Sequence, residues 1–160
     1  MRGYVELLTF VLLTGCVSFP ASNSWPPTST GVNEWTDKST GHKVIRLSRR
    51  DGANEVFYFH QNPFTADGDK MVFMGQTDKG RNAFTVDLRT FEIRQITTMN
   101  TGFEVVAPKS RQLFYLSGDS VYSTHLDTRE TREIAHVPHH YTWGRGFSVN
   151  SDETMLAACY

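Results

Sequence analysis

The sequence lacks the features that mark several common classes of protein. It has 16 Lys and Arg residues against 17 Asp and Glu residues, so it carries no excess positive charge of the kind that draws proteins to nucleic acids. After residue 16, no stretch shows the periodicity of an amphipathic helix. The G-x-S-x-G turn of many hydrolases is also missing. These absences argue against a nucleic-acid partner and favour a protein built from strands.

Long hydrophobic runs are scarce, and the run near the N-terminus, residues 7–13, is too short to span a bilayer. Because Arg2 precedes it, the pattern predicts a signal peptide over residues 1–15. The sequence Leu13-Thr-Gly-Cys16 resembles the bacterial lipobox, which implies that Cys16 becomes lipidated and anchors the protein to a membrane. The alternative is an ordinary secretory peptide with an incidental cysteine.

The segment after the signal peptide, residues 16–33, is rich in Ser, Thr, Pro and Asn and is interpreted as a flexible tether carrying the lipidated Cys16. Val17 and Ser18 provide no acidic retention signal. We therefore expect an exported lipoprotein that is periplasmic or at the cell surface, with the outer membrane favoured. The folded domain is expected to span residues 34–160.

Cysteine is rare, because Cys159 is the only cysteine besides Cys16. If Cys16 is lipidated, Cys159 has no partner for an intrachain disulfide. We therefore interpret Cys159 as a small buried residue within a strand.

Internal repetition is the most informative feature that is present. Three segments share an apolar start, a polar turn and a second apolar run, and they recur about every 40 residues. They are FTADGDKMVF (64–73), VAPKSRQLFY (106–115) and SVNSDETMLA (148–157).

A second family of segments alternates with the first, and each member reads as a strand, a short polar turn and another strand. Two hairpins per period give four strands, which is the unit of a β-propeller blade. The alternative is a β-sandwich with evenly spaced strands. The members are EWTDKSTGHKVIRLS (34–48), TVDLRTFEIRQIT (85–97) and STHLDTRETREIA (123–135).

The phase of the repeat predicts an incomplete propeller. Two full blades are expected near residues 57–98 and 102–137, with a half-blade at each end. The first half-blade, residues 34–48, matches the second half of a blade, so we expect a later part of a longer parent to complete it. Since propellers generally have about 4 to 8 blades, the 160 residues are expected to be an N-terminal part.

Several motifs resemble a known family in order and spacing. The blade turn FTADGDKMVF is similar to the repeat of TolB-type propellers, which indicates fold alone. The wider set resembles the beginning of the oligogalacturonate lyases, seven-bladed propellers that cleave short pectin fragments. The set consists of DKSTGHKVIRLS (37–48), FYFHQNPFTADG (57–68), VDLRT (86–90), RQIT (94–97) and WGRGFSVNSD (143–152).

The resemblance implies metal-assisted β-elimination on oligogalacturonides by the parent protein. In that family a divalent cation, usually manganese, is held by three His and one Gln, and another His is the base. These residues lie in later blades, and nothing in this chain matches them, so no metal ligand or catalytic residue is assigned here. The chain alone is expected to bind no metal and to be inactive. The alternative is a non-catalytic TolB-like propeller that binds sugars or proteins at the cell envelope. In either case we expect a monomer.

The candidate substrate contacts are residues expected to lie at the mouth of the central funnel. Arg145 lies between two glycines, and its guanidinium matches a carboxylate, although a structural ion pair is an open alternative. Tyr58, His60 and Gln61 precede the first repeat turn, and the alternative role for His60 and Gln61 is to satisfy backbone groups of the loop. The histidine cluster around residues 136–140 is interpreted as exposed loop residues.

Overall fold

The computed structural model describes residues 33–144 and 146–159, which lie in one compact unit, Val32–Tyr160. These residues contain twelve β-strands and no helix that could cross a membrane. The strands are β1 (Glu34–Thr36), β2 (Lys43–Ile45), β3 (Asn54–Glu55), β4 (Lys70–Thr77), β5 (Gly80–Asp87), β6 (Ile93–Gln95), β7 (Gly102–Ala107), β8 (Gln112–Ser117), β9 (Ser120–His125), β10 (Thr131–His136), β11 (Phe147–Val149) and β12 (Leu156–Ala158).

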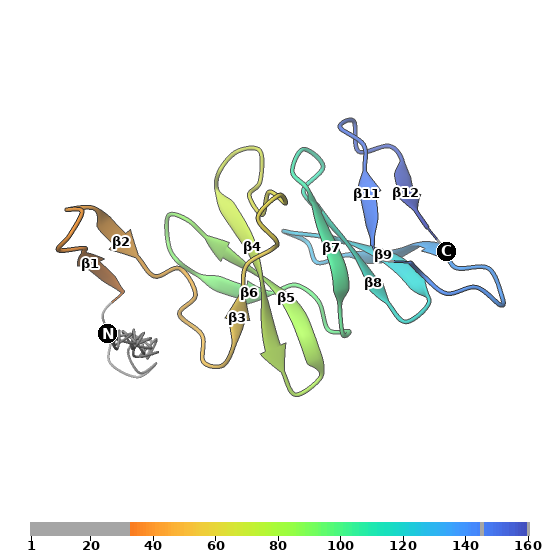
Figure 1. Ribbon diagram of the computed structural model, residues 1–160, viewed down its shortest axis with the longest axis horizontal. Helices are drawn as coiled ribbons and strands as arrows, with labels where there is room; N and C mark the ends of the chain where they lie inside the picture. The colour runs from red at the N-terminus through yellow and green to blue at the C-terminus, as the bar shows by residue number, and fades with distance from the viewer. Residues whose placement is uncertain (1–32, 145, 160) are drawn as a thin grey trace, which may run out of the picture. The chain divides into compact units, whose positions relative to one another are not determined.

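The strands form two four-stranded antiparallel sheets and two hairpins (Figure 1). The first sheet has the order β3-β4-β5-β6, and the second contains β7 to β10 in chain order. We call these sheets blade 1 and blade 2. β1 pairs with β2, and β11 pairs with β12. The predicted all-β architecture of four-stranded blades is therefore confirmed, although the first strand of blade 1 begins at Asn54, upstream of the predicted boundary.

Three hairpins share one type of turn, which explains why their sequences looked alike. In the β1–β2 and β5–β6 turns the first residue is an aspartate, and Oδ1 of Asp37 or Asp87 accepts backbone N–H bonds from the residues two and three positions later, at 2.8–2.9 Å. The bond from the Ser39 hydroxyl, together with these amides, holds the pKa of Asp37 at about 2. In the β9–β10 turn, Nδ1 of His125 accepts the corresponding bonds at 3.2 and 3.3 Å.

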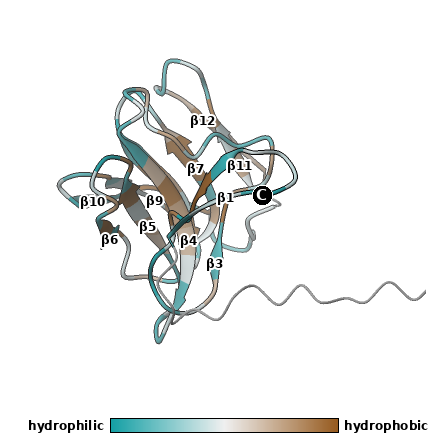
Figure 2. Ribbon diagram, turned by 90° about the vertical axis from the view of Figure 1, so that its left-hand side faces the viewer, coloured by the Kyte–Doolittle hydropathy of each residue, from teal (hydrophilic) through white to brown (hydrophobic). Residues whose placement is uncertain are grey.

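The main hydrophobic core lies between the two blades. Buried residues on one face of blade 1, among them Val72 and Met74, form a single cluster with Leu113 and Tyr115 of blade 2. The other face of blade 1 carries a second cluster around Phe73, packed against Leu47 from the segment after β2. Figure 2 shows that the hydrophobic residues concentrate along the strands of the sheets and that the turns are more hydrophilic. Burial of apolar side chains on both faces of blade 1 stabilises the sheet.

Charged residues in the turns connect blade 1 to blade 2. Arg111 of blade 2 donates two bonds of 2.9 Å to Asp69 of blade 1, and its Nε donates to Asp127 at 2.6 Å. Lys70 also contacts Asp127. Because Arg111 donates to both carboxylates, the pKa values of Asp69 and Asp127 lie well below the usual range and that of Arg111 lies above it.

A similar connection joins blade 2 to the β11–β12 hairpin. The carboxylate of Glu153 accepts the backbone N–H groups of Lys109 and Ser110 at 2.9 and 2.6 Å. The Lys109 ammonium donates to the Ser151 carbonyl at 2.8 Å. These contacts come from the same turn of successive repeats, so the repeat fixes how each blade meets the next.

The interpretation of Cys159 as a buried strand residue is wrong. Cys159 follows the last residue of β12 and its thiol is free and exposed. Its backbone carbonyl accepts an N–H bond from Gly144 at 2.8 Å, so the backbone of this residue is ordered by the neighbouring segment even though no sheet face covers its side chain.

Candidate sugar-binding site

The first strands of the two blades are interrupted at equivalent positions. In blade 2, Phe103 and Glu104 lie opposite the single residue Tyr115, which makes a β-bulge. In blade 1 the interruption is larger, because pairing stops at Glu55 opposite Met74 and resumes only at the Phe64 to Met71 bridge. Residues 56–63 form the intervening segment, which we call the inner loop.

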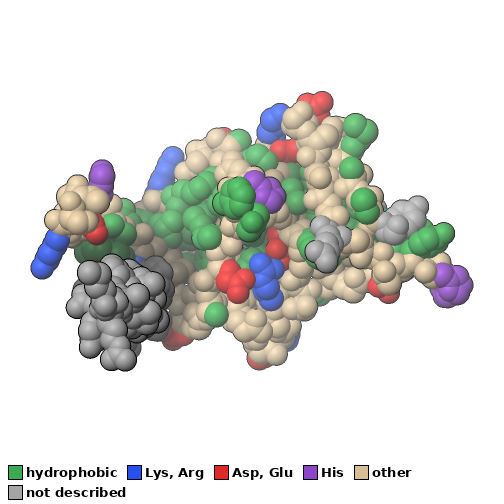
Figure 3. Space-filling model, viewed as in Figure 1, with side chains coloured by type: hydrophobic (Ala, Val, Ile, Leu, Met, Phe, Trp, Pro, Cys, Tyr) green, Lys and Arg blue, Asp and Glu red, His purple; other side chains and the backbone are tan. Residues whose placement is uncertain are grey.

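The inner loop carries three aromatic rings in mutual contact. The ring centroids of Tyr58 and Phe59 are 4.4 Å apart, and the His60 ring lies 5.1 Å from Tyr58 and 5.6 Å from Phe59. Phe59 is 85% exposed and Tyr58 is 64% exposed. In Figure 3 hydrophobic side chains and a histidine gather over the segment between β3 and β4. Exposed rings in contact with one another are a feature of binding surfaces rather than of packing.

An ion-pair cluster holds both ends of the inner loop. The Glu104 side chain is 7% exposed and pairs with Nη1 of Arg81 on β5. Nε of Arg81 lies 3.2 Å from a carboxylate oxygen of Glu55, the residue before the loop. At the other end, Nε2 of Gln61 donates to the Glu104 backbone carbonyl at 2.9 Å. Both ends of the loop therefore contact the Arg81–Glu104 pair, of which Glu104 is buried and Arg81 is partly exposed.

The predicted contact residues fall into three situations. Tyr58 and His60 lie together in the inner loop with their rings exposed. Gln61 also lies there, but its amide donates to a backbone carbonyl, so its contact positions the loop. Arg145 lies outside the described residues. Its neighbour Gly146 lies close to Phe103, whose ring would be 3.3 Å from a Cβ built on that glycine.

Sequence reasoning did not single out three residues of this site, namely Phe59, Arg81 and Glu55. Phe59 could have been found, because it belongs to a run of three aromatic residues, 57–59, that directly precedes the first repeat turn. Arg81 and Glu55 had no local signal, since they lie 26 positions apart and meet only in the folded sheet.

The described residues provide no cluster of three or more His, Cys, Asp or Glu side chains that could hold a metal ion. His139 and His140 follow β10, with ring centroids 4.2 Å apart. His136 was assigned to the same loop cluster, but it ends β10, and its Nδ1 lies 2.8 Å from the Ser120 hydroxyl. The donor set for a divalent cation is thus not present in this part of the chain.

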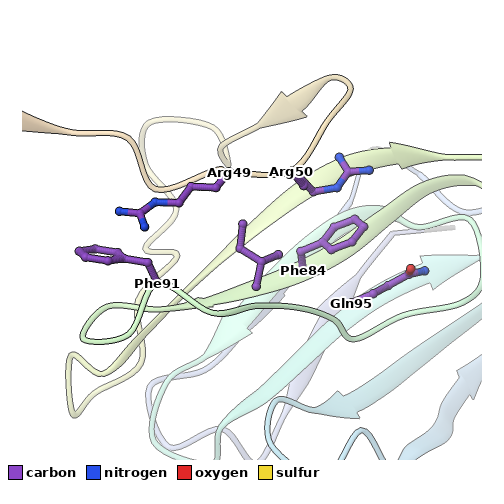
Figure 4. A pocket seen from close by; sticks show the side chains of 6 residues that line it. Arg49, Arg50, Phe84, Phe91 and Gln95 are labelled. Atoms are coloured by element: carbon purple, nitrogen blue, oxygen red, sulfur yellow. The ribbon is translucent and has the colours of Figure 1, made fainter. Parts of the chain in front are cut away.

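A shallow hollow of about 400 Å³ lies on the outer face of blade 1. Figure 4 shows Arg49 beside Phe91 and Arg50 beside Phe84, with the guanidinium carbons 4.2 and 4.3 Å from the ring centroids. Arg50 also donates to the Gln76 carbonyl at 2.7 Å. Since both guanidinium groups are stacked on rings, this hollow is part of the packing of the segment before β3 against the sheet.

The repeated four-stranded antiparallel sheets, interrupted in their first strands by a bulge and a loop, define a β-propeller protein. The sequence profile of the oligogalacturonate lyase family matches residues 28–159. The chain therefore belongs to the oligogalacturonate lyase family.

Individual relatives agree with this assignment. The chain is 30% identical over 132 residues to the oligogalacturonate lyase of Dickeya dadantii, with 80% of this chain and 34% of the relative covered. It is 29% identical to the oligogalacturonide lyase of Pectobacterium atrosepticum over 126 residues, covering 76% of this chain and 32% of the relative. The chain thus spans about a third of the length of the curated relatives it matches.

Solved structures show the same fold. An oligogalacturonate lyase in complex with manganese superposes with a TM-score of 0.68 at 31% identity, over 77% of this chain and 34% of that chain. The oligogalacturonate lyase of Vibrio parahaemolyticus gives the same TM-score and coverage at 29% identity. TolB from Acinetobacter baumannii superposes with a TM-score of 0.53 at 17% identity, over 77% of this chain and 30% of that chain, which is evidence for the propeller fold alone.

Proposed function

We propose that the complete protein is an oligogalacturonate lyase that cleaves short, pectin-derived galacturonides. The observation that carries this proposal is the family match over residues 28–159. The exposed inner loop supports it, because this loop offers rings and polar groups suited to a sugar on the strand where a propeller binds its ligand.

The reaction we propose is β-elimination. A base removes the C5 proton of a galacturonate unit, the C5–H electron pair forms the C4–C5 double bond, and the C4–oxygen bond breaks, with the leaving oxygen taking a proton. The carboxylate beside C5 must be neutralised, and a divalent cation supplies that chemistry. A relative contains manganese, and we extend this requirement to the complete protein. The residues described here do not fit such an ion, so no step is assigned to them through it.

The part played by this chain is to contact the sugar. Tyr58 and His60 present a hydroxyl and ring nitrogens beside an apolar surface, which suits a polyhydroxylated ring with C–H faces. We also propose that Arg145 contacts a substrate carboxylate. Gln61 acts by positioning the loop.

The test is an ultraviolet assay of the complete protein with digalacturonate and manganese. A rise in absorbance from the 4,5-unsaturated uronate is expected, and its absence with folded protein would contradict the proposal. The 160-residue chain alone is expected to give no turnover, because it provides no metal-binding cluster among its described residues. Turnover by the purified 160-residue chain contradicts that expectation.

We further propose that the protein is exported as a monomeric lipoprotein anchored through Cys16, a residue outside those the structure describes. The support is the sequence before Cys16. Metabolic labelling with a fatty acid should mark the wild-type protein and not Cys16→Ser, and Cys159→Ser should label normally. Fatty-acid labelling of the Cys16→Ser variant would contradict the proposal that Cys16 carries the lipid. Size-exclusion chromatography of the complete protein tests whether it is a monomer.

A further inference from the structure

We propose that the inner loop is a stacking subsite for one sugar unit, with Phe59 as its main contact. The proposal rests on the proposed function, because it assigns the ligand as a galacturonide. The observation that carries it is a set of three touching rings, Tyr58, Phe59 and His60, on a loop fixed at both ends.

No side chain among the described residues covers Phe59. A phenylalanine side chain that is 85% exposed contributes little to burial, and leaving its apolar surface in water is unfavourable. Tyr58 and His60 do not cover it, since Tyr58 is itself largely exposed and His60 is also classed as exposed. Covering Phe59 with an apolar surface from a ligand would therefore be favourable.

Contacts at both ends of the inner loop restrain its conformation. Glu55 and Gln61 hold its two ends through Arg81 and Glu104, and Glu104 is buried. A loop held in this way loses little conformational freedom on binding, so more of the contact energy appears as affinity.

The size of the surface favours a single sugar ring over a protein. A specific protein interface buries about 800 Å² on each partner, whereas three rings on a loop of eight residues provide much less. A galactopyranose ring carries the hydrogens of C3, C4 and C5 on one face, and such an apolar face stacks on an aromatic ring. The hydroxyls at its edge can then reach the Tyr58 hydroxyl and the His60 nitrogens.

Stacking also determines which sugar unit lies there. A unit stacked through its C3–C4–C5 face has its C5 hydrogen against the ring, where a base cannot reach it. The stacked unit is therefore a neighbour of the unit that loses its C5 proton. The subsite contributes to affinity for the oligosaccharide, so its loss should raise KM more than it lowers kcat.

The experiment compares Phe59→Ala, Phe59→Trp and the control Ile134→Ala, which removes a partly exposed apolar side chain from β10. In the complete protein, Phe59→Ala should weaken digalacturonate binding about tenfold, measured by calorimetry with EDTA present, and should raise KM in the manganese assay. Phe59→Trp should retain the wild-type affinity for digalacturonate, because it keeps an aromatic ring at this position. The melting temperature of Phe59→Ala should equal that of the wild type.

Further variants and outcomes separate this inference from the proposed function. Gln61→Ala, which frees one end of the loop, should weaken binding less than Phe59→Ala does. If the wild-type protein cleaves digalacturonate and Phe59→Ala has the same KM, the stacking role is overturned and the lyase function stands. If the protein binds digalacturonate through Phe59 without cleaving it, the lyase function is overturned and the subsite stands. An absence of both binding and cleavage overturns both.

Discussion

Blade 1 and blade 2 share their strand order and the pairing of their second and third strands, yet they differ sharply in their first strands. β4 pairs with β5, and β8 pairs with β9, through uninterrupted registers. In the first strands, by contrast, blade 2 has a two-residue bulge and blade 1 has an eight-residue loop. The middle strands pack between neighbours and tolerate little change, whereas the first strand can accept an insertion. The two blades thus differ at the strand where we propose that the substrate binds.

The faces of the two blades differ in what covers them. Leu113 and Tyr115 of blade 2 pack against blade 1, while the equivalent face of blade 1, with Met71 and Phe73, is packed against Leu47 from a connecting segment. One face of blade 1 is therefore covered by a second sheet, blade 2. The face that carries Met71 and Phe73 is covered by a single segment of chain. We expect the former to contribute more to stability.

The largest effect should come from truncating the core between the blades. Leu113→Ala should cost about 2–5 kcal/mol of unfolding free energy, because Leu113 is fully buried and a second sheet prevents collapse of the cavity. Met71→Ala, at the equivalent position of blade 1, should cost less because a connecting segment can follow the cavity. Urea denaturation of the complete protein measures both. Equal losses of stability in the two variants would contradict the distinction between the two faces. As a control, Ile134→Ala, on the surface, should change the free energy of unfolding by only about 0.5 kcal/mol.

The next effect concerns the charges that join the blades. Arg111→Met should cost about 1–3 kcal/mol at neutral pH, because it leaves Asp69 and Asp127 without their main partner. Arg94→Met removes an arginine from an exposed pair with Glu92 and should cost much less, because solvent screens that pair. Thermal unfolding at pH 7 measures the difference.

The same variant predicts a change in acid stability. The pKa values of Asp69 and Asp127 are lowered in the folded protein, so their contribution is present above the unfolded value near 4 and is lost as the pH falls through that value towards the folded ones. The wild-type protein should therefore lose stability steeply on acidification. In Arg111→Met this loss should be shallower. Parallel acid profiles would show that the two carboxylates are not coupled to Arg111.

Much of this fold could be predicted from the sequence because its signals are local. The three hairpin turns repeat a pattern of Asp or His, Thr and a residue with positive φ, and that pattern was visible as aligned segments. The start of blade 1 was misplaced by three residues, because the inner loop separates β3 from the rest of its strand and breaks the period.

The candidate site could be predicted only in part. Tyr58 and His60 were predicted as contacts because they precede a recognisable repeat turn, and the structure places their rings together. Arg81 and Glu104 pair across two blades, and no local pattern in the sequence specifies a contact that depends on how neighbouring sheets pack. The role of Gln61 depends on the same packing, since its acceptor is a carbonyl of the next blade.

The smallest expected effect concerns a buried hydrogen bond that blade 2 has and blade 1 lacks, next to ring pairs that are otherwise equivalent. Phe73 stacks on Phe84 in blade 1, and Tyr115 stacks on Tyr122 in blade 2, at 5.6 and 5.8 Å. Tyr115 hydrogen-bonds Thr124 at 3.1 Å. By strand register, the positions of Tyr115 and Thr124 correspond to Phe73 and Val86, so blade 1 fills the same two positions with apolar side chains.

Tyr115→Phe should therefore cost about 1 kcal/mol, and Thr124→Val slightly more, because the Thr124 hydroxyl bonds both the buried Tyr115 hydroxyl and the Thr131 hydroxyl. The double variant, which recreates the apolar pair of blade 1, should cost less than the sum of the single changes by about 0.5–1 kcal/mol. Urea denaturation of the four proteins in this cycle measures the coupling. Strict additivity would mean that the hydroxyl bond contributes nothing, and that the two blades differ at these positions without any energetic consequence.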